Sequence, residues 1–217
     1  MNNLRKSLLI LFVTMAAVFA PSAMNAQSGS WSDESNRDTQ WGSDYETATV
    51  FSINSHEQLA QFAYMVNEGN NFNGKTVILN DAEEEGWGGQ VWTYDYYDMR
   101  DYSWVPVGTA DNPFLGTFNG NGKEIYLSID DEQATYQGFF GYIGSNGSVI
   151  NTTVRSSEIT AASQVGAIAG YNGGTMTNCV VTDNTIAGTS YAGAIVGQNA
   201  GTMTTCYAIE VNVPAIG

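Results

Sequence analysis

Basic residues are scarce in this 217-residue sequence, which contains seven Lys and Arg against 22 Asp and Glu and has a net charge of −15. Proteins that bind nucleic acid or anionic membranes neutralise phosphate with positive charge. The composition therefore argues against both partners. Only 13% of the residues are charged at all, so solubility comes from neutral polar groups, as in many extracellular β-proteins.

Histidine and cysteine are also nearly absent, with His56, Cys179 and Cys206 as the whole complement. The two Cys occupy equivalent repeat positions, and with a single His they do not make a zinc site. The sequence also lacks a Gly-x-Ser-x-Gly motif, a His-Glu-x-x-His motif and a phosphate loop followed by a helix. No recognised catalytic signature is left, and we expect His56 to be a solvated side chain at a helix start.

Long hydrophobic runs are missing beyond residues 8–20, and about 13 apolar residues are too few for the ~20 of a membrane span. The run follows Arg5 and Lys6 and precedes small residues up to Ala26, as in a signal peptide. No Cys follows for a lipid anchor. We expect cleavage near Ala26 and a secreted or cell-surface mature chain without a transmembrane segment, in which five basic residues face 22 acidic ones.

An internal repeat occupies the C-terminal half. Residues 165–179 read VGAIAGYNGGTMTNC and residues 192–206 read AGAIVGQNAGTMTTC, at an offset of 27 residues. A fainter first copy starts at Gly138 and joins this register at Gly147, after two extra residues. Short β-segments alternate with Gly and Asn turns. A period of this length suits one coil of two or three strands, so we expect an all-β parallel β-helix with three repeat coils in residues 138–217.

Equivalent apolar residues of successive repeats should stack inside the coils. Stacked strands place equivalent Cα atoms ~4.8 Å apart, within disulfide range, so the Cys pair is either a disulfide or two inward-facing thiols. Gly173 and Gly174 predict a corner with positive φ. The expected inward ladders are Ile168 with Ile195, Met176 with Met203, and Cys179 with Cys206.

One helix is expected ahead of the repeats. Residues 27–46 are polar, acidic and poor in aliphatics, which predicts a flexible leader. Ser55 and Gln58 then have capping-box spacing, and Gly69 is a suitable C-terminal cap. We expect the helix to cover the end of the β-stack, within an N-terminal unit of residues 47–137. Its apolar stripe comprises Leu59, Phe62, Ala63 and Val66.

Residues 81–104 differ from the rest, with three Trp, four Tyr, seven carboxylates and one basic residue, Arg100. Aromatic rings flanked by carboxylates and hydroxyls stack on sugars and are common in protein interfaces. The segment is therefore either a binding surface or a lid that folds down and buries its rings. The candidate ligand-binding residues are Trp87, Trp92, Tyr94, Tyr96, Tyr97 and Trp104.

Calcium is the one cofactor that the same segment suggests, since Ca²⁺ prefers oxygen ligands. The spacing of its carboxylates matches no recognised calcium loop, and a solvated acidic face is the alternative. The carboxylates concerned are Glu83, Glu84, Glu85, Asp95, Asp98 and Asp101.

Residues 166–181 and 193–208 resemble the GLUG motif, the short glycine-rich repeat of large exported bacterial surface proteins. The segment INSHEQLAQFAYMVNEGNNFNGKTVIL, the Trp-x-Pro-x-Gly block from Trp104, and FLGTFNGNGKEIYLSI resemble the cap and first coils that precede such repeats. The usual Gly-Leu of the motif is Ala-Ile here. The resemblance implies a right-handed β-helix in an adhesin-like surface protein, and it transfers no catalytic residues.

These observations predict a non-catalytic exported module that contacts a host or matrix glycan or protein. One alternative is a structural repeat region of a larger secreted enzyme such as a peptidase. Another is a glycan-cleaving β-helix, because Asp183 and Glu210 stack one coil apart and retaining glycosidases use carboxylates ~5 Å apart. No polar terminal repeat covers the last coil, so we expect either a truncated piece of a longer protein or association through this open coil.

Overall fold

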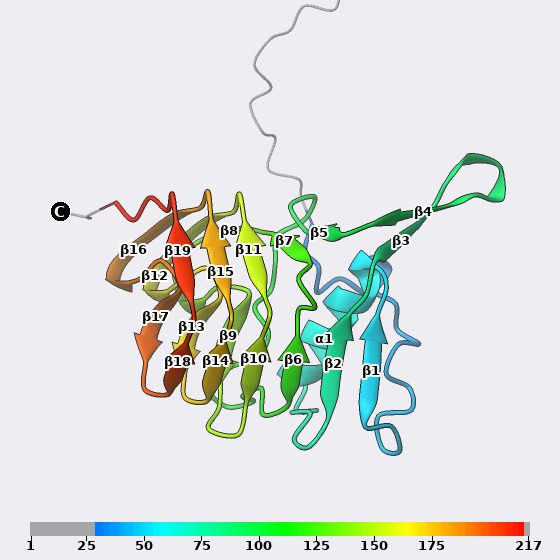
Figure 1. Ribbon diagram of the computed structural model, residues 1–217, viewed down its shortest axis with the longest axis horizontal. Helices are drawn as coiled ribbons and strands as arrows, with labels where there is room; N and C mark the ends of the chain where they lie inside the picture. Colours follow the sequence, from blue (N-terminus) through cyan, green and yellow to red (C-terminus); the bar gives the residue numbers. More distant parts are fainter. Residues whose placement is uncertain (1–28, 215–217) are drawn as a thin grey trace, which may run out of the picture.

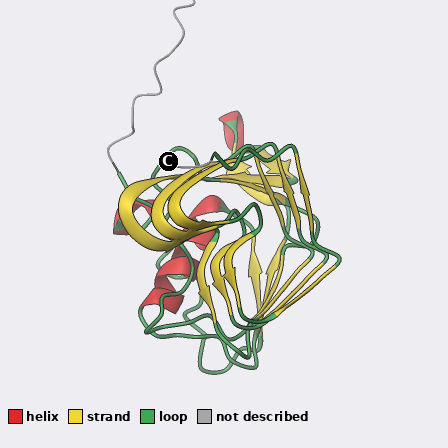
Figure 2. Cartoon of the chain, turned by 90° about the vertical axis from the view of Figure 1, so that its left-hand side faces the viewer, coloured by secondary structure: helices red, strands yellow, loops and turns green. Residues whose placement is uncertain are grey.

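The computed structural model describes residues 29–214 and is a parallel β-solenoid of about six turns (Figure 1). The expected mostly-β fold is confirmed, with one α-helix in the described part of the chain. The predicted signal peptide lies outside the described residues. Seen along the axis, the sheets form the sides of the coils (Figure 2), and buried hydrophobic side chains fill the interior.

Two long parallel sheets form two sides of the solenoid. Each strand is only three or four residues long, because the chain must turn a corner after every side. One sheet has the order β1 (Val50–Ile53), β2 (Thr76–Leu79), β6 (Thr117–Asn119), β10 (Ser148–Ile150), β14 (Thr175–Thr177) and β18 (Thr202–Thr204). The other has the order β5 (Tyr96–Asp98), β7 (Glu124–Tyr126), β11 (Thr153–Arg155), β15 (Val180–Thr182) and β19 (Tyr207–Ile209).

Two three-stranded sheets complete the outline. The strands of the first are long and curve outward before the chain returns (Figure 2). They are β8 (Ser128–Gln137), β12 (Glu158–Val165) and β16 (Thr185–Ala192). The returning sheet consists of β9 (Phe140–Ile143), β13 (Ala169–Asn172) and β17 (Val196–Asn199).

Successive coils stack at the offset that the repeat predicts. Ser148 pairs with Thr175, and Thr175 pairs with Thr202. In β14 the central Met176 points inward and its threonine neighbours are exposed. The inward members Ile168, Met176 and Cys179 are fully buried or nearly so, while Ile195, Met203 and Cys206 of the last described coil are partly buried against the same core.

Both cysteines are free thiols in the structure, with Cys179 buried and Cys206 partly buried. Burial raises the pKa of the Cys179 thiol to about 12, which keeps it protonated. Its Sγ lies 3.6 Å from the carbonyl oxygen of Val149, one coil away.

The corners correct one expectation from the sequence. Gly173 and Gly174 are not among the described residues with positive φ. Glycine is needed at 174 because a Cβ there would overlap the carbonyl oxygen of Gly147 in the neighbouring coil. The left-handed conformation is adopted one strand later, by Asn151 (φ 50°), Asn178 (φ 55°) and Thr205 (φ 54°).

Replacing Thr205 by Asn should therefore stabilise the protein by about 1 kcal/mol, because Asn tolerates positive φ far better than a β-branched residue. It would also extend the side-chain ladder in which Asn178 Nδ2 donates to Asn151 Oδ1 at 2.8 Å. Urea unfolding of Thr205→Asn and Thr204→Asn tests this, since residue 204 is equally exposed but lies in a strand. Equal effects of the two changes would contradict the explanation.

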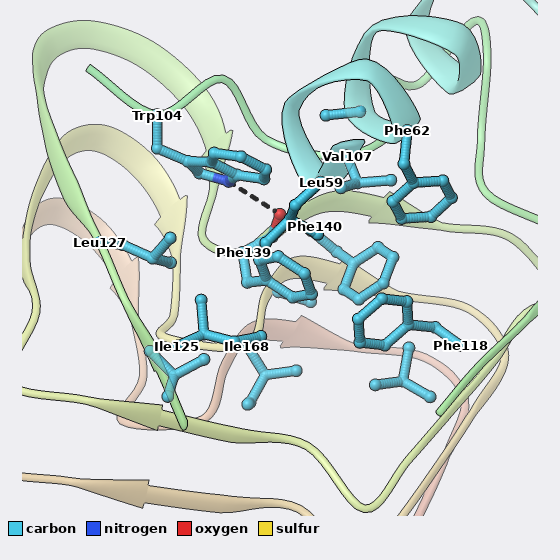
Figure 3. Packing of buried hydrophobic residues seen from close by; sticks show 14 of the residues in the cluster. Leu59, Phe62, Trp104, Val107, Phe118, Ile125, Leu127, Phe139, Phe140 and Ile168 are labelled. Atoms are coloured by element: carbon cyan, nitrogen blue, oxygen red, sulfur yellow. Dashed lines mark hydrogen bonds between the residues drawn. The ribbon is translucent and has the colours of Figure 1, made fainter. Parts of the chain in front are cut away.

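Helix α1 (His56–Asn67) begins at the predicted N-cap Ser55, and the Gln58 side chain reaches back to Asn54, one residue before the N-cap. The Ser55 hydroxyl accepts from the Gln58 N–H at 3.3 Å, and Gln58 Oε1 accepts from the Asn54 N–H at 2.9 Å. The helix connects β1 to β2, so it closes the first turn of the solenoid. Figure 3 shows Leu59 and Phe62 of its apolar stripe in the core, where the Phe62 ring lies 5.8 Å from that of Phe118.

The predicted flexible leader is wrong for the part that the structure describes, residues 29–46. Trp31 and Trp41 are 6% and 9% exposed, and their indole N–H groups donate to the carbonyl oxygens of Met99 and Ser52, both at 2.7 Å. The guanidinium of Arg37 lies 3.6 Å from the centre of the Tyr64 ring on α1. The other residues of this segment are too polar to pack it against the solenoid. The apolar surface that the two indole rings bury is enough to do so.

Candidate functional site

A β-hairpin projects from the N-terminal end of the solenoid (Figure 1). Antiparallel strands β3 (Ala82–Glu85) and β4 (Val91–Tyr94) form it, with Glu84 opposite Trp92. The 3₁₀ turn at its tip (Trp87–Gly89) contains Gly88 and Gly89 with φ of 76° and 79°, a conformation that favours glycine. Residues 82–94 of the aromatic segment thus extend away from the solenoid, whereas β5 (Tyr96–Asp98) and Trp104 belong to it.

Four of the six candidate aromatic residues are accessible. Trp87 at the hairpin tip is 97% exposed and Trp92 is 53% exposed, whereas Tyr94 and Tyr96 are partly buried. The rings of Tyr94 and Tyr96 lie 5.3 Å apart at the base of the hairpin. These four residues provide a line of aromatic rings from the solenoid wall to the hairpin tip.

Tyr97 and Trp104 are not ligand contacts, and their assignment as candidates is wrong. Tyr97 is fully buried on the inward face of β5, and its hydroxyl lies 2.8 Å from the carbonyl oxygen of Ile53, to which it donates. Trp104 is 2% exposed, and its indole N–H donates to the Phe139 carbonyl oxygen at 3.1 Å (Figure 3). The two-residue alternation of β5 sends Tyr96 outward and Tyr97 inward.

An acidic cleft of about 670 Å³ lies at the base of the hairpin. Besides the carboxylates listed below, four side chains line the cleft, namely Trp31, His56, Tyr96 and Tyr102. Because like charges share this space, the cleft attracts cationic groups. Its carboxylates are Glu57, Glu83, Glu84, Glu85, Asp98 and Asp101.

His56 is buried at the floor of this cleft, so the expectation of a solvated side chain is wrong. It is 9% exposed, and its Nε2 accepts a hydrogen bond from the Asp98 N–H at 3.0 Å. The neutral imidazole therefore carries its proton on Nδ1. That nitrogen lies 3.7 Å from Glu84 Oε1, beyond hydrogen-bond distance, and it makes no hydrogen bond within the described residues.

One carboxylate of the cleft, that of Asp98, is paired with a basic side chain. Arg100 makes two hydrogen bonds to the Asp98 carboxylate, at 2.7 and 2.6 Å. Burial by itself raises the pKa of Asp98, but the hydrogen bonds and the charge of Arg100 outweigh burial and hold the pKa below its usual range. Asp98 therefore stays ionised in its pair with Arg100.

The carboxylates are not arranged as a metal site. Within residues 29–214, no group of three or more His, Cys, Asp or Glu side chains is placed to hold a metal ion. The three glutamates of β3 follow one another along an extended strand, which separates their carboxylates.

The two carboxylates of the glycan-cleaving alternative lie elsewhere, at a corner of the repeat coils. Asp183 and Glu210 have φ of 59° and 53°, so they are turn residues. Arg155 lies 3.2 Å from Asp183 and 3.0 Å from Glu124, and it bridges carboxylates of two other coils. The Asp183 carboxylate is therefore occupied by an ion pair with Arg155.

Known proteins resemble parts of this chain. It is 42% identical over 72 residues to "Halomucin" of Haloquadratum walsbyi, a match that covers 32% of this chain and 1% of halomucin. It is 40% identical over 83 residues to a "Putative Gly-rich membrane protein" of Evansella cellulosilytica, which covers 36% of this chain and 10% of that protein. The chain thus spans a tenth or less of the length of these relatives.

No protein-family model and no solved structure matches the chain. The GLUG resemblance therefore stays a prediction. Among residues 29–214, no helix combines the length and the apolar character that crossing a membrane requires.

Sequence reasoning missed four residues of the cleft: Trp31, His56, Glu57 and Tyr102. Trp31 belongs to the segment predicted to be flexible, and His56 and Glu57 open a helix whose packing partners come from later in the chain. An aromatic residue inside a polar leader was the one signal in the sequence that could have indicated packing.

Proposed function

We propose that this chain is a non-catalytic module of a large exported surface protein of the GLUG-repeat type, and that it binds a glycan or a protein through the hairpin and the cleft beside it. The names of the two relatives, a halomucin and a membrane protein, support a surface location. Their much greater length supports a module of a larger protein.

One observation carries the binding role. Trp87, the most exposed large hydrophobic residue among those described, is at the tip of a projecting hairpin, with Trp92 on its second strand. Exposing two apolar indole rings to water is unfavourable in free energy, and binding a partner would offset this. Trp is also enriched among binding hot spots. The other three Trp are buried, so the exposed pair is separate from the core.

The test is to measure binding of the purified chain to a glycan array and to immobilised extracellular matrix proteins. The double variant Trp87→Ala and Trp92→Ala should lose at least about tenfold in affinity for whichever probe binds, because truncated Trp hot spots each cost about 2 kcal/mol or more. Ligand-dependent quenching of Trp fluorescence should disappear with it.

Tyr207 and Ile209, both 54% exposed on β19, provide the matched control. Their double Ala variant also removes two exposed apolar side chains and should leave binding unchanged. If no probe binds, or if both double variants bind like the parent chain, the proposal fails.

A second candidate function is a structural repeat region of a larger secreted enzyme. The small share of the relatives' length that this chain covers is the observation in its favour. A full-length protein that keeps its surface binding when the hairpin tip is removed would support this candidate over the first.

A further inference from the structure

Three hollows on the N-terminal part of the molecule share lining residues. The acidic cleft of about 670 Å³ adjoins a second hollow of about 170 Å³, because Trp31 lines both. The second adjoins a third of about 390 Å³, because Asn67 and Val105 line both. The three hollows are therefore neighbours, and we call this row of hollows the furrow.

The furrow runs along helix α1. The helix residues that line it are His56 in the cleft, Ala60 and Ala63 in the second hollow, and Asn67 where the second and third meet. Spacings of three and four residues place these side chains on one face of the helix. A 12-residue helix is about 18 Å long, which matches about five or six residues of an extended polypeptide.

The chemistry of the furrow changes from end to end. The cleft is acidic, with six carboxylates. The middle hollow has apolar walls of Trp31, Ala60, Ala63 and Val105. Its rim also includes Ser32, Tyr64, Asn67 and Glu68. At the far end, Tyr136 and Gln137 join Thr109 and Asp111 in a hollow with a single carboxylate.

His56 adds a directed hydrogen-bond donor at the acidic end. The residue is 9% exposed, and its Nε2 accepts from the Asp98 N–H. Its Nδ1 lies 3.7 Å from Glu84 Oε1 and makes no hydrogen bond within residues 29–214. A donor in this position suits a carbonyl oxygen. The acidic residues of the cleft cannot supply such a donor while they are ionised.

We infer that the furrow binds an extended polypeptide segment with Lys or Arg over the acidic cleft, a backbone carbonyl at His56 and an aliphatic side chain in the middle hollow. A polypeptide fits better than a glycan, because a basic side chain can pair with the carboxylates of the cleft and a neutral sugar cannot. The inference rests on the proposed binding function and names its partner class.

The test uses fluorescein-labelled peptides and fluorescence anisotropy with the full chain. The probes are acetyl-KRGLGSTS-amide, its reversed sequence, the same peptides with Glu in place of Lys and Arg, and the same peptides with Ser in place of Leu. At least one basic peptide should bind, the acidic peptides should not, and binding should weaken between 50 and 300 mM NaCl as salt screens the carboxylates.

Matched variants locate the site. Replacing three cleft residues by Gln (Glu57→Gln, Glu83→Gln, Glu85→Gln) should weaken basic-peptide binding about tenfold, since all three are exposed and each ion pair contributes modestly. The control Asp130→Asn, Asp131→Asn, Glu132→Gln removes the same charge from exposed positions on β8 and should change affinity less than about twofold.

A double-mutant cycle tests the middle hollow. Val105→Ser should weaken binding of the Leu peptide and leave the affinity of the Ser peptide unchanged. Equal binding of basic and acidic peptides, equal losses in the two triple variants, or no coupling at Val105 would overturn the inference. If glycan binding that depends on Trp87 and Trp92 persists in that case, the proposed function survives and only the peptide assignment fails.

Discussion

Replacing Gly174 by Ala is expected to destabilise the solenoid by about 3 kcal/mol, the upper range for forcing atoms into a packed interior. The added Cβ would overlap the carbonyl oxygen of Gly147 and lie within 2.6 Å of that of Gly144. Backbone atoms of a neighbouring coil cannot move aside without breaking the hydrogen bond from Thr175 N–H to Gly147. Urea unfolding followed by circular dichroism measures the loss.

The neighbouring Gly173 is the control for this change. A Cβ at 173 would meet the Tyr171 ring at 3.0 Å and the Ile143 carbonyl oxygen at 3.2 Å, so small side-chain and backbone adjustments suffice. Gly173→Ala should cost about 1 kcal/mol or less. If the two alanine variants unfold at the same urea concentration, close stacking of the coils is not the reason for glycine at 174.

Asn184→Leu should lower the free energy of unfolding by at least about 3 kcal/mol, as Gly174→Ala does, but for a different reason. Asn184 is 1% exposed, its Oδ1 accepts from the Ser157 N–H at 2.8 Å, and its Nδ2 donates to the carbonyl oxygens of Val154 and Thr182 at 3.0 and 2.8 Å. Leucine would leave these buried backbone groups unpaired, and each unpaired group costs about 1 to 3 kcal/mol.

Two further variants separate hydrogen bonding from simple disruption. Asn212→Leu makes the same chemical change at an exposed position and should alter stability by less than about 0.5 kcal/mol. In Asn184→Asp, a carboxylate would face two carbonyl oxygens, so its folded pKa should exceed the unfolded value of about 3.9. Its deficit should therefore shrink below about pH 4 and grow as the pH rises. A deficit independent of pH would contradict this role of the Nδ2 donor.

The repeat made the solenoid predictable because each structural level agrees with it. The 27-residue offset between Met176 and Met203 reappears as strand register, and the inward and outward alternation in β14 follows from the sequence Thr-Met-Thr. The helix was equally predictable, because its start depends on the local Ser55 and Gln58 contacts. Local rules succeed where one short segment contains all the partners.

The corners show where such rules failed. Gly174 was expected to need positive φ, but the demand for glycine comes from the neighbouring coil. The left-handed residues are instead Asn178 and its equivalents, including Thr205, which is a poor residue for that conformation. A single sequence does not show which atoms of the next coil approach each turn.

The candidate site was predicted only in part. Trp87 and Trp92 are exposed, as a binding surface requires, whereas Tyr97 and Trp104 have the same local composition and are buried. Their difference depends on the strand pairing of β5 with β7 and on the position of Phe139. The cleft itself joins residues 31, 56 and 84, which are distant in sequence.

The sequence by itself determined the parallel solenoid, its repeat length, the single helix and the acidic, aromatic character of residues 81–104, because periodicity and composition are properties of the chain. The tertiary structure alone decided that the leader packs through Trp31 and Trp41, that His56 is buried, and that three hollows meet along α1. These features arise where segments far apart in the chain pack together, and no local pattern specifies that packing.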